Sequence, residues 1–393
     1  MRPLEGITVV AIEQAIAAPF CTRQLADLGA RVIKVERPGT GDFARHYDDR
    51  VNGLASHFVW TNRSKESVTL DLKQSEARSL LADLVARADV LVQNLAPGAA
   101  ERLGLAYEDL ATSHPRLIVC DISGYGRGGP YSDKKAYDLM IQSECGLLSV
   151  SGTAAEPCKA GISVSDISAG MYAYSSILAA LLQRSRTGMG THIEVSLFET
   201  SVEWMGFPMY YAYQDASPPP RTGAAHATIY PYGPFAAGIG GDVMLGLQNE
   251  REWMIFCAQV LRLPALAENE EYSSNARRVA SRLKLQSIIL DRFASLSADE
   301  VVRRLDEAGI ANARVNTVAE VWAHPQLKAR GRWTEVSTQA GRIPALKPPA
   351  MLQGMEARMD PVPGLGEHTV SVLRELGVSD ERIARLREAR IID

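Results

Sequence analysis

Asp166 precedes a run in which nearly every position is apolar or small, within the stretch SVSDISAGMYAYSSILAALL (residues 163–182). A carboxylate in this place can serve in two ways. It can cap the helix that the run predicts, by accepting hydrogen bonds from the first backbone N–H groups, a role worth about 1 kcal/mol. It can also be held there to react as a nucleophile. The local sequence favours the cap and leaves the second role open.

The predicted helix after Asp166 is rich in small side chains. A glycine inside a helix costs roughly 1 kcal/mol relative to alanine, so we expect a packing or ligand reason for Gly170. Small residues on one helix allow another element to approach closely, which would leave the carboxylate little room to move. These features suit a functional acid without requiring one. The other small residues are Ala169, Ala173, Ser175, Ser176 and Ala179.

Other arrangements of reactive residues are weak. The segment SGYGRGG is not the GxSxG turn of a serine hydrolase. The seven histidines show no HExxH or paired spacing, and the five cysteines form no CxxC pair. We therefore predict no metal site and no disulfide framework.

Short β-type runs alternate with helical patterns in the first half of the chain. Strands separated by helices at this rhythm predict an α/β fold with a large, Rossmann-like parallel sheet covered on both faces. Ligands bind such sheets at the carboxyl ends of the strands. The candidate ligand loops are therefore EQAIAAP, ERPGTGD and NLAPGAAERLG, and none contains GxGxxG. The predicted strands are ITVVAI, RVIKVE, SVTLDL, DVLVQNL, LIVCDIS and THIEVSL.

The pattern changes in the second half of the chain. A segment with three consecutive prolines predicts a linker, and PYGPFAAGIGGDVMLGLQ predicts a hairpin around a glycine-rich turn. We predict a large α/β domain over residues 1–213, a linker over 214–227, a smaller α/β domain over 228–325, and a return to the large domain over 326–393.

Composition narrows the class of protein. The 393 residues include 42 Lys and Arg against 46 Asp and Glu, a formal net charge of −4. Nucleic-acid-binding proteins usually carry a basic excess, so we expect no nucleic-acid partner. No apolar run approaches the roughly 20 residues of a membrane span, and the first residues do not read as a signal peptide. A cytoplasmic protein without a membrane partner is the expectation.

Six phrases in order resemble the family III CoA-transferases, the group of formyl-CoA transferase and carnitine CoA-transferase, over nearly the whole chain. The first is PLEGITVVAIEQAIAAPFCTRQLADLGARVIKVERPGTGD, and Asp166 lies in the fifth. The resemblance implies a ring-shaped chain in an interlaced homodimer. The others are NRSKESVTLDLK, DVLVQNLAPGAAERLGL, AYDLMIQ, DISAGMYAYSSILAALLQRSRTGMGTHIEVSLFE and PVPGLGEHT.

The resemblance implies that Asp166 is the catalytic nucleophile. Its carboxylate would attack an acyl-CoA thioester to give a mixed anhydride, and the CoA thiolate would return to form an aspartyl-CoA thioester. An acceptor carboxylic acid would then reverse these steps. The substrates would be an acyl-CoA and a free acid, with no tightly bound cofactor and no metal.

The resemblance also implies the residues around CoA. The turn with Gly238, Gly240 and Gly241 matches the family's mobile glycine-rich loop, which would cover the reacting acyl group. Carried over by position, the residues lining the CoA site are Ala17, Arg37, Lys73, Asn94, Leu95, Arg102, Leu103, Lys135 and Tyr137.

The acceptor is less determined. HATIYPYGPF and LGLQNEREW resemble the subgroup that acts on dicarboxylates of four and five carbons, which favours succinyl-CoA as donor and itaconate or a related acid as acceptor. Arg45 or His226 would bind the second carboxylate.

Three alternatives stay open. One is intramolecular transfer between the C1 and C4 carboxyls of mesaconyl-CoA, and another is CoA binding without turnover. The third, a 2-methylacyl-CoA racemase, is disfavoured because Tyr137 replaces the histidine of the His-Asp pair in racemases. A tyrosine with a pKa near 10 is a poor base at neutral pH.

Overall fold

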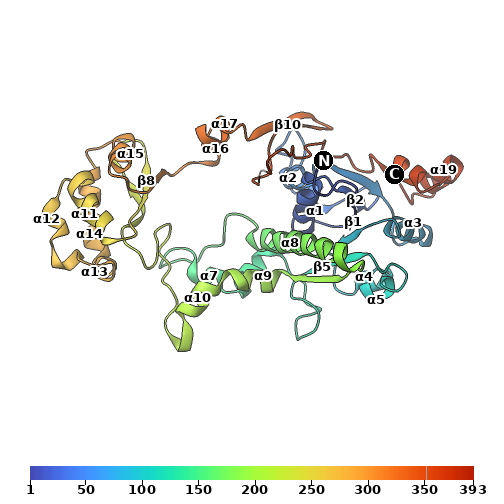
Figure 1. Ribbon diagram of the computed structural model, residues 1–393, viewed down its shortest axis with the longest axis horizontal. Coiled ribbons are helices and arrows are strands. Elements are labelled where there is room, and N and C mark those ends of the chain that lie inside the picture. The colour runs from blue at the N-terminus through green and yellow to red at the C-terminus, as the bar shows by residue number, and fades with distance from the viewer. Residues whose placement is uncertain (351) are drawn as a thin grey trace. The chain divides into compact units, whose positions relative to one another are not determined.

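The chain divides into two compact units in the computed structural model, which describes residues 1–350 and 352–393 (Figure 1). The first comprises Met1–Gly146, Ala160–Gly206 and Leu327–Asp393, and the second comprises Leu147–Lys159 and Phe207–Gln326. Met351, inside the predicted C-terminal segment, lies outside the described residues.

The predicted linker over residues 214–227 belongs to the second unit. Arg221 Nε donates to the carbonyl oxygen of Thr153 at 2.8 Å, and Gly223 N donates to the carbonyl oxygen of Gly152 at 2.7 Å. These bonds tie the residues after the prolines to residues 147–159, which the sequence had grouped with the large domain. The second unit therefore consists of Leu147–Lys159 and Phe207–Gln326, and its longer segment begins at Phe207, before the predicted linker.

The first unit is built on a six-stranded sheet in the order β3-β2-β1-β4-β5-β6, with every neighbouring pair parallel. This confirms the predicted α/β fold. The order reverses between β1 and β4, and in such sheets ligands bind at the carboxyl ends of the strands at this switch point. The strands are β1 (Thr8–Ile12), β2 (Arg31–Glu36), β3 (Lys65–Thr69), β4 (Val90–Gln93), β5 (Ile118–Ser123) and β6 (His192–Ser196).

Helices cover both faces of this sheet. On one face α1 (Ala17–Asp27) and α8 (Val164–Thr187) share an apolar core with the strands. The other face packs against α3 (Ser75–Val85), α18 (Thr369–Glu375) and α19 (Asp380–Glu388). Because both faces are covered, the inner strands read as continuous apolar runs. The end of the sequence thus returns to the sheet, and α19 lies near α3 (Figure 1).

Shorter elements complete the first unit. A hairpin, β10 (Trp333–Thr338) and β11 (Gly341–Leu346), is antiparallel. The remaining elements are η1 (Phe43–His46), α2 (Ser56–Asn62), α4 (Ala99–Arg102), α5 (Tyr107–Leu110), α6 (Asp138–Glu144) and α9 (Leu197–Trp204), with α17 (Pro325–Ala329) at the boundary between the units.

The second unit holds an antiparallel sheet in the order β7-β8-β9, and its first two strands confirm the predicted hairpin. Its core gathers aromatic side chains, among them Phe235, Trp253 and Phe293. The strands are β7 (Tyr232–Ala236), β8 (Asp242–Gly246) and β9 (Asn312–Arg314). The helices are α7 (Leu147–Val150), α10 (Gly206–Tyr211, from the boundary), η2 (Tyr213–Asp215), α11 (Glu250–Ile255), η3 (Phe256–Val260), α12 (Pro264–Ala267), η4 (Glu270–Tyr272), α13 (Asn275–Ala280), α14 (Arg282–Phe293), α15 (Ala298–Glu307) and α16 (Val318–Trp322). Among the described helices of both units, none has the length and apolar character needed to cross a membrane.

Candidate active site

Asp166 is the third residue of α8, and another acid caps the helix. The cap position belongs to Ser163, whose side chain makes no capping bond. Instead Asp138, from α6, accepts hydrogen bonds at Oδ1 from the backbone N of Ser165 at 2.8 Å and of Asp166 at 3.4 Å. The capping role that local sequence favours for Asp166 is therefore wrong, because a residue distant in sequence fills it.

The environment of Asp166 makes its carboxyl group unusually basic. Burial, followed by the negative charge of Asp138, raises the pKa of Asp166 to about 7. Among the residues that the structure describes, none forms a hydrogen bond or an ion pair with this carboxylate. A carboxylate without compensating partners is a stronger nucleophile than one held in a salt bridge. Strongly shifted acids of this kind cluster at functional sites.

Gly170 lets α8 pack against the start of α1. A Cβ atom at this position would lie 2.7 Å from the carbonyl oxygen of Ala17 and 3.1 Å from Phe20 Cδ1. This confirms the packing reason expected for a glycine inside this helix. The close approach packs α8, one turn beyond Asp166, against the start of α1.

One predicted CoA residue, Asn94, binds the loop after β1 at the switch point. Asn94 accepts from Gln14 N at 2.8 Å through Oδ1 and donates through Nδ2 to Gln14 O at 2.9 Å. Leu95 N donates to Gln93 Oε1 at 2.6 Å. Ala17 begins α1 immediately after this loop and is almost fully buried. The structure thus brings Ala17, Asn94 and Leu95 to the carboxyl ends of β1 and β4.

A buried network of charged side chains contacts the loop between β1 and α1. Lys34 Nζ lies 2.7 Å from Asp42 Oδ2 and 3.3 Å from Glu13 Oε1, and Lys65 Nζ lies 2.7 Å from the same Glu13 oxygen. Asp42 Oδ1 accepts from the backbone N of Ala15, whose φ of 62° is uncommon for a residue with a side chain. The network therefore stabilises the loop with Ala15 in this uncommon conformation.

Arg45, predicted to bind the second carboxylate of the substrate, binds Glu36 in the structure. Its Nε and Nη2 atoms bind the two carboxylate oxygens of Glu36 at 2.8 and 2.7 Å, and its guanidinium lies 3.7 Å from the ring centroid of Phe58. The side chain of Glu36 is fully buried. A substrate carboxylate would have to compete with this two-bonded pair, so Arg45 is not part of our proposal for substrate binding.

The predicted basic residues lie near strand ends. Arg37 follows β2 and Lys73 follows β3, and both line one cavity of about 560 Å³. Arg102 ends α4, after β4, and its side chain is exposed. Leu103 follows it and packs against the core shared by the sheet and α3. The first two cations are thus brought together, while Arg102 belongs to the neighbouring loop.

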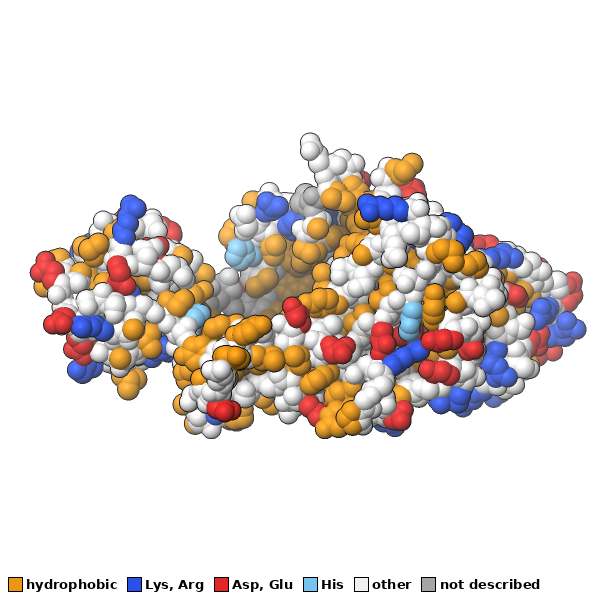
Figure 2. All heavy atoms as spheres, turned by 60° about the horizontal axis from the view of Figure 1, so that its bottom comes forward, with side chains coloured by type: hydrophobic (Ala, Val, Ile, Leu, Met, Phe, Trp, Pro, Cys, Tyr) orange, Lys and Arg blue, Asp and Glu red, His pale blue; other side chains and the backbone are white. Residues whose placement is uncertain are grey.

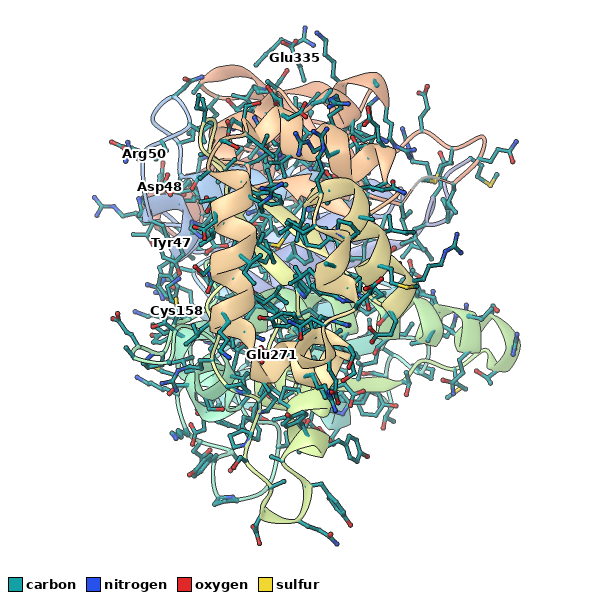
Figure 3. All side chains as sticks on the ribbon, turned by 90° about the vertical axis from the view of Figure 1, so that its left-hand side faces the viewer. Tyr47, Asp48, Arg50, Cys158, Glu271 and Glu335 are labelled. Carbon is teal, nitrogen blue, oxygen red and sulfur yellow. The ribbon has the colours of Figure 1, made fainter. Side chains whose placement is uncertain are left out.

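Tyr47 lies within electrostatic reach of both Asp166 and Tyr137. Tyr137 stands at the start of α6, 71% exposed, next to the exposed Lys135. Tyr47 follows η1 (Figure 3), and its pKa is raised by burial and then by the charges of Asp42, Asp166 and Tyr137. Tyr47 was not predicted as a site residue, since nothing in the turn-rich segment around it indicates one.

The remaining predicted residues belong to the second unit. Gly238 N donates to the carbonyl oxygens of Phe293 and Leu296 at 3.1 and 2.9 Å, so this end of the turn is pinned to the segment after α14. Gly240 and Gly241 form the rest of the turn with φ values of 90° and 88°. The covering role of the turn stays a prediction.

His226 is held by a local turn. Its Nδ1 accepts from the backbone N atoms of Thr228 and Ile229, each at 3.1 Å, and its ring stacks on Tyr232 with centroids 5.2 Å apart. Because Nδ1 accepts, the neutral ring carries its proton on Nε2.

The model of CoA-transferase family III matches residues 4–369. The chain belongs to this family. It is 32% identical to the human succinyl-CoA:glutarate CoA-transferase, covering 100% of this chain and 90% of that protein. It is 34% identical to the succinate–glutarate CoA-transferase of Agrobacterium fabrum, over 95% and 96% of the two chains. Among solved structures, a CAIB/BAIF family protein from Brucella suis matches with a TM-score of 0.85 and 34% identity, over 95% of this chain and 99% of that one.

Membership in family III makes the protein an enzyme whose substrates are acyl-CoA thioesters and carboxylic acids. The site chemistry agrees with that assignment. A carboxylate with a raised pKa lies at the start of α8, and loops and cations suited to a phosphorylated ligand gather at the strand ends. In the described part of this CoA-transferase, no group of three His, Cys, Asp or Glu side chains could hold a metal ion.

Proposed function

We propose that this CoA-transferase moves CoA from succinyl-CoA to a dicarboxylate of four or five carbons, with itaconate and glutarate as the leading acceptors, and that Asp166 is its nucleophile. The observation that carries the proposal is the partner-free carboxylate of Asp166 with its raised pKa, next to a helix start that Asp138 caps. The acceptor class is supported by the two relatives that are named for succinyl or succinate and glutarate.

The reaction proceeds through two covalent intermediates. Asp166 Oδ attacks the carbonyl carbon of the thioester, and the C–S bond breaks. CoA leaves as the thiolate, and the donor acyl group stays on Asp166 as a mixed anhydride. The thiolate then attacks the aspartyl carbonyl, which releases the donor acid as its carboxylate and leaves an aspartyl-CoA thioester. The acceptor carboxylate attacks that thioester and the same two steps run backwards. No net proton is consumed, and exchange between similar carboxylates is close to neutral in energy. The covalent intermediates divide one difficult exchange into steps with lower barriers.

Tyr47 fits the role of hydrogen-bond donor in these steps. A tyrosine hydroxyl is protonated at neutral pH, and burial and the nearby carboxylates raise the pKa of Tyr47 further. Negative charge develops on the carbonyl oxygen when the thioester or anhydride is attacked. A protonated hydroxyl beside Asp166 would stabilise that oxygen in the transition state.

The remaining residues act in binding. Ala17, Asn94 and Leu95 would hold the pantetheine arm at the switch point, and the cations Arg37, Lys73, Arg102 and Lys135 would bind phosphates, with Leu103 and Tyr137 beside them. The turn with Gly238, Gly240 and Gly241 would cover the acyl group. The Nε2 proton of His226 is the candidate donor for the second carboxylate.

We also propose that the enzyme is a cytoplasmic homodimer. Large apolar side chains are exposed between residues 204 and 213, and patches of hydrophobic side chains appear on the face shown in Figure 2. Exposed apolar patches of this kind mark protein interfaces. A second copy of the chain is the partner that the family resemblance implies. The exposed apolar side chains in this segment are those of Trp204, Phe207, Met209, Tyr210, Tyr211 and Tyr213.

The test offers succinyl-CoA with a mixture of glutarate, itaconate, mesaconate, citramalate and malate, and identifies every new CoA thioester by mass spectrometry. The native enzyme should form a thioester of at least one dicarboxylate, and Asp166→Asn should form none. A second incubation with mesaconyl-CoA alone detects intramolecular transfer. Transfer by the variant at the native rate would refute the nucleophile, and transfer to monocarboxylates alone would refute the acceptor class.

A further inference from the structure

The last residues of the sequence line the cavity beside Arg37 and Lys73. Arg387, at the end of α19, and Arg390, just beyond it, contribute to its wall together with Ile392 and Asp393. The cavity lies at the carboxyl ends of β2 and β3, on one side of the switch point. Four cationic side chains therefore surround one space of about 560 Å³.

The cavity wall carries more cationic than acidic side chains. In the described parts of the chain none of the four cations forms an ion pair with the side chain of an Asp or Glu. The two acids in the wall are already engaged by donors. Asp71 Oδ1 accepts from Lys73 N at 3.2 Å, and Asp393 Oδ2 accepts from Gly39 N at 3.0 Å. Four cations against two acidic side chains thus give the space a positive charge that suits an anionic ligand.

The segment around Arg390 is built into the sheet. Asp71 N donates to Ile391 O at 2.8 Å, and Asp393 N donates to Thr69 Oγ1 at 3.0 Å, so the segment is anchored at the end of β3. Arg387 Nε donates to Asp393 O at 3.1 Å, which leaves both of its Nη groups available. These contacts fix the cations relative to the strand ends before any ligand arrives.

Arg390 occupies a position where glycine is the usual residue. Ile391 N bonds Leu386 O at 2.9 Å and Arg390 N bonds Arg387 O at 2.9 Å, the two bonds of a Schellman motif at the end of α19. The motif places Arg390 in the left-handed region with φ of 55°. A side chain there is strained relative to glycine. The arginine therefore carries a conformational cost that its own helix end does not explain.

We infer that Arg387 and Arg390 complete the pocket for the nucleotide end of CoA and bind its 3′-phosphate. This deepens the proposed function and rests on CoA thioesters being the substrate. CoA carries its reactive sulfur and its 3′-phosphate at opposite ends, and the thioester must reach Asp166 beside the switch point. A cationic cavity at the ends of β2 and β3 is placed for the far end of the molecule, with Pro38 and Ile392 as apolar wall for the adenine.

The experiment compares succinyl-CoA with its 3′-dephospho analogue in the full-length enzyme. The variants are Arg387→Gln and Arg390→Gly, with Arg385→Gln as control, because Arg385 is exposed on α19 and does not line the cavity. We expect each of the two variants to raise the KM for succinyl-CoA about tenfold, with kcat unchanged. The KM for the dephospho analogue should not change. Arg390→Gly should also raise the melting temperature by about 2 °C, since it relieves the left-handed strain.

Two results would overturn the inference. One is an unchanged KM for succinyl-CoA in both variants, and the other is an equal rise for the two thioesters. Calorimetric titration with free CoA and 3′-dephospho-CoA measures the same preference without turnover. An enzyme that shows the preference but transfers CoA to no dicarboxylate would refute the proposed function and leave this inference standing.

Discussion

Asp138 Oδ1 accepts a hydrogen bond from the backbone N of Asp166, and the charge of Asp138 is at the same time a cause of the raised pKa of Asp166. One side chain therefore fixes the start of α8 and tunes the acid that α8 presents. A helix start normally favours a negative charge in its first turn. Here the capping residue Asp138 supplies that charge. Burial and repulsion from Asp138 therefore raise the pKa of Asp166.

Replacing Asp166 by asparagine should abolish transfer. Asparagine has nearly the same shape but no nucleophilic carboxylate, so we expect kcat to fall by about a thousandfold or more. The measurement is the rate of thioester formation from succinyl-CoA. Binding of CoA itself should persist, which separates a lost nucleophile from a lost fold.

The same substitution should stabilise the protein at high pH. The pKa of Asp166 is raised from 3.8 to about 7, so the folded state holds a proton there that the unfolded state has lost. Stability contributed by the native group is present below about pH 4 and is lost as pH rises toward 7. The full shift corresponds to about 4 kcal/mol, and partial solvent exposure reduces it to on the order of 2 kcal/mol.

Thermal unfolding of native protein and Asp166→Asn measures this difference. We expect the variant to gain over the native protein as pH rises from about 4 to about 8. If Asp166 were a structural cap, the variant would be no more stable at either pH, and the account of its environment would be wrong.

The pH dependence of catalysis should follow the ionisation of Asp166. Only the ionised carboxylate attacks, so kcat/KM should rise with pH and level off above about 7. Asp138→Asn keeps an oxygen for the cap and removes the charge, so the rise should move to lower pH. Asp133→Asn, at an exposed acid nearby, is the control and should leave the profile unchanged. An unmoved profile in Asp138→Asn would contradict the role given to that charge.

Gly170→Ala should damage both stability and binding. The added Cβ would lie 2.7 Å from the backbone oxygen of Ala17, so α8 or α1 must shift. We expect a loss of about 1–3 kcal/mol and a raised KM for acyl-CoA. Gly206→Ala is the matched control, because a Cβ there has nothing within 4 Å. Equal melting temperatures for the two variants would show that the contact is not tight.

Tyr47→Phe should lower kcat with little effect on stability. The hydroxyl is the proposed donor to the reacting carbonyl, and the ring is 50% exposed, so its packing is a small part of the fold. We expect kcat to fall by about 10- to 100-fold with a nearly unchanged KM. Tyr131→Phe, at a tyrosine also partly exposed, should leave kcat at the native level. A Tyr47→Phe enzyme with native kcat would remove the hydroxyl from the mechanism.

The strands were predictable where burial on both faces demanded apolar runs, and one exception shows the limit. The third strand was expected at SVTLDL but runs over Lys65–Thr69. The start of this strand was missed because a lysine in the sequence predicts a surface position, and Lys65 is buried beside a charged partner. That partner is Glu13, whose Oε1 lies 2.7 Å away but 52 residues earlier in the chain.

Site residues show the same limit. The position of Asp166 on its helix was visible in the sequence, whereas its cap comes from Asp138, 28 residues away. The sequence predicted that Arg45 could bind a substrate carboxylate, whereas in the structure its guanidinium binds Glu36. Local sequence reports propensity, and the partners that decide a charge's role are brought together only by the fold.

The most direct test of the central claim is to trap the covalent intermediate. The native enzyme is incubated with succinyl-CoA without an acceptor, and its mass and peptides are measured by mass spectrometry. We predict an adduct of CoA less water on the peptide that contains Asp166, which disappears when a dicarboxylate is added and never forms in Asp166→Asn. An adduct on another residue, or transfer with no adduct in a rapidly quenched reaction, would contradict the account.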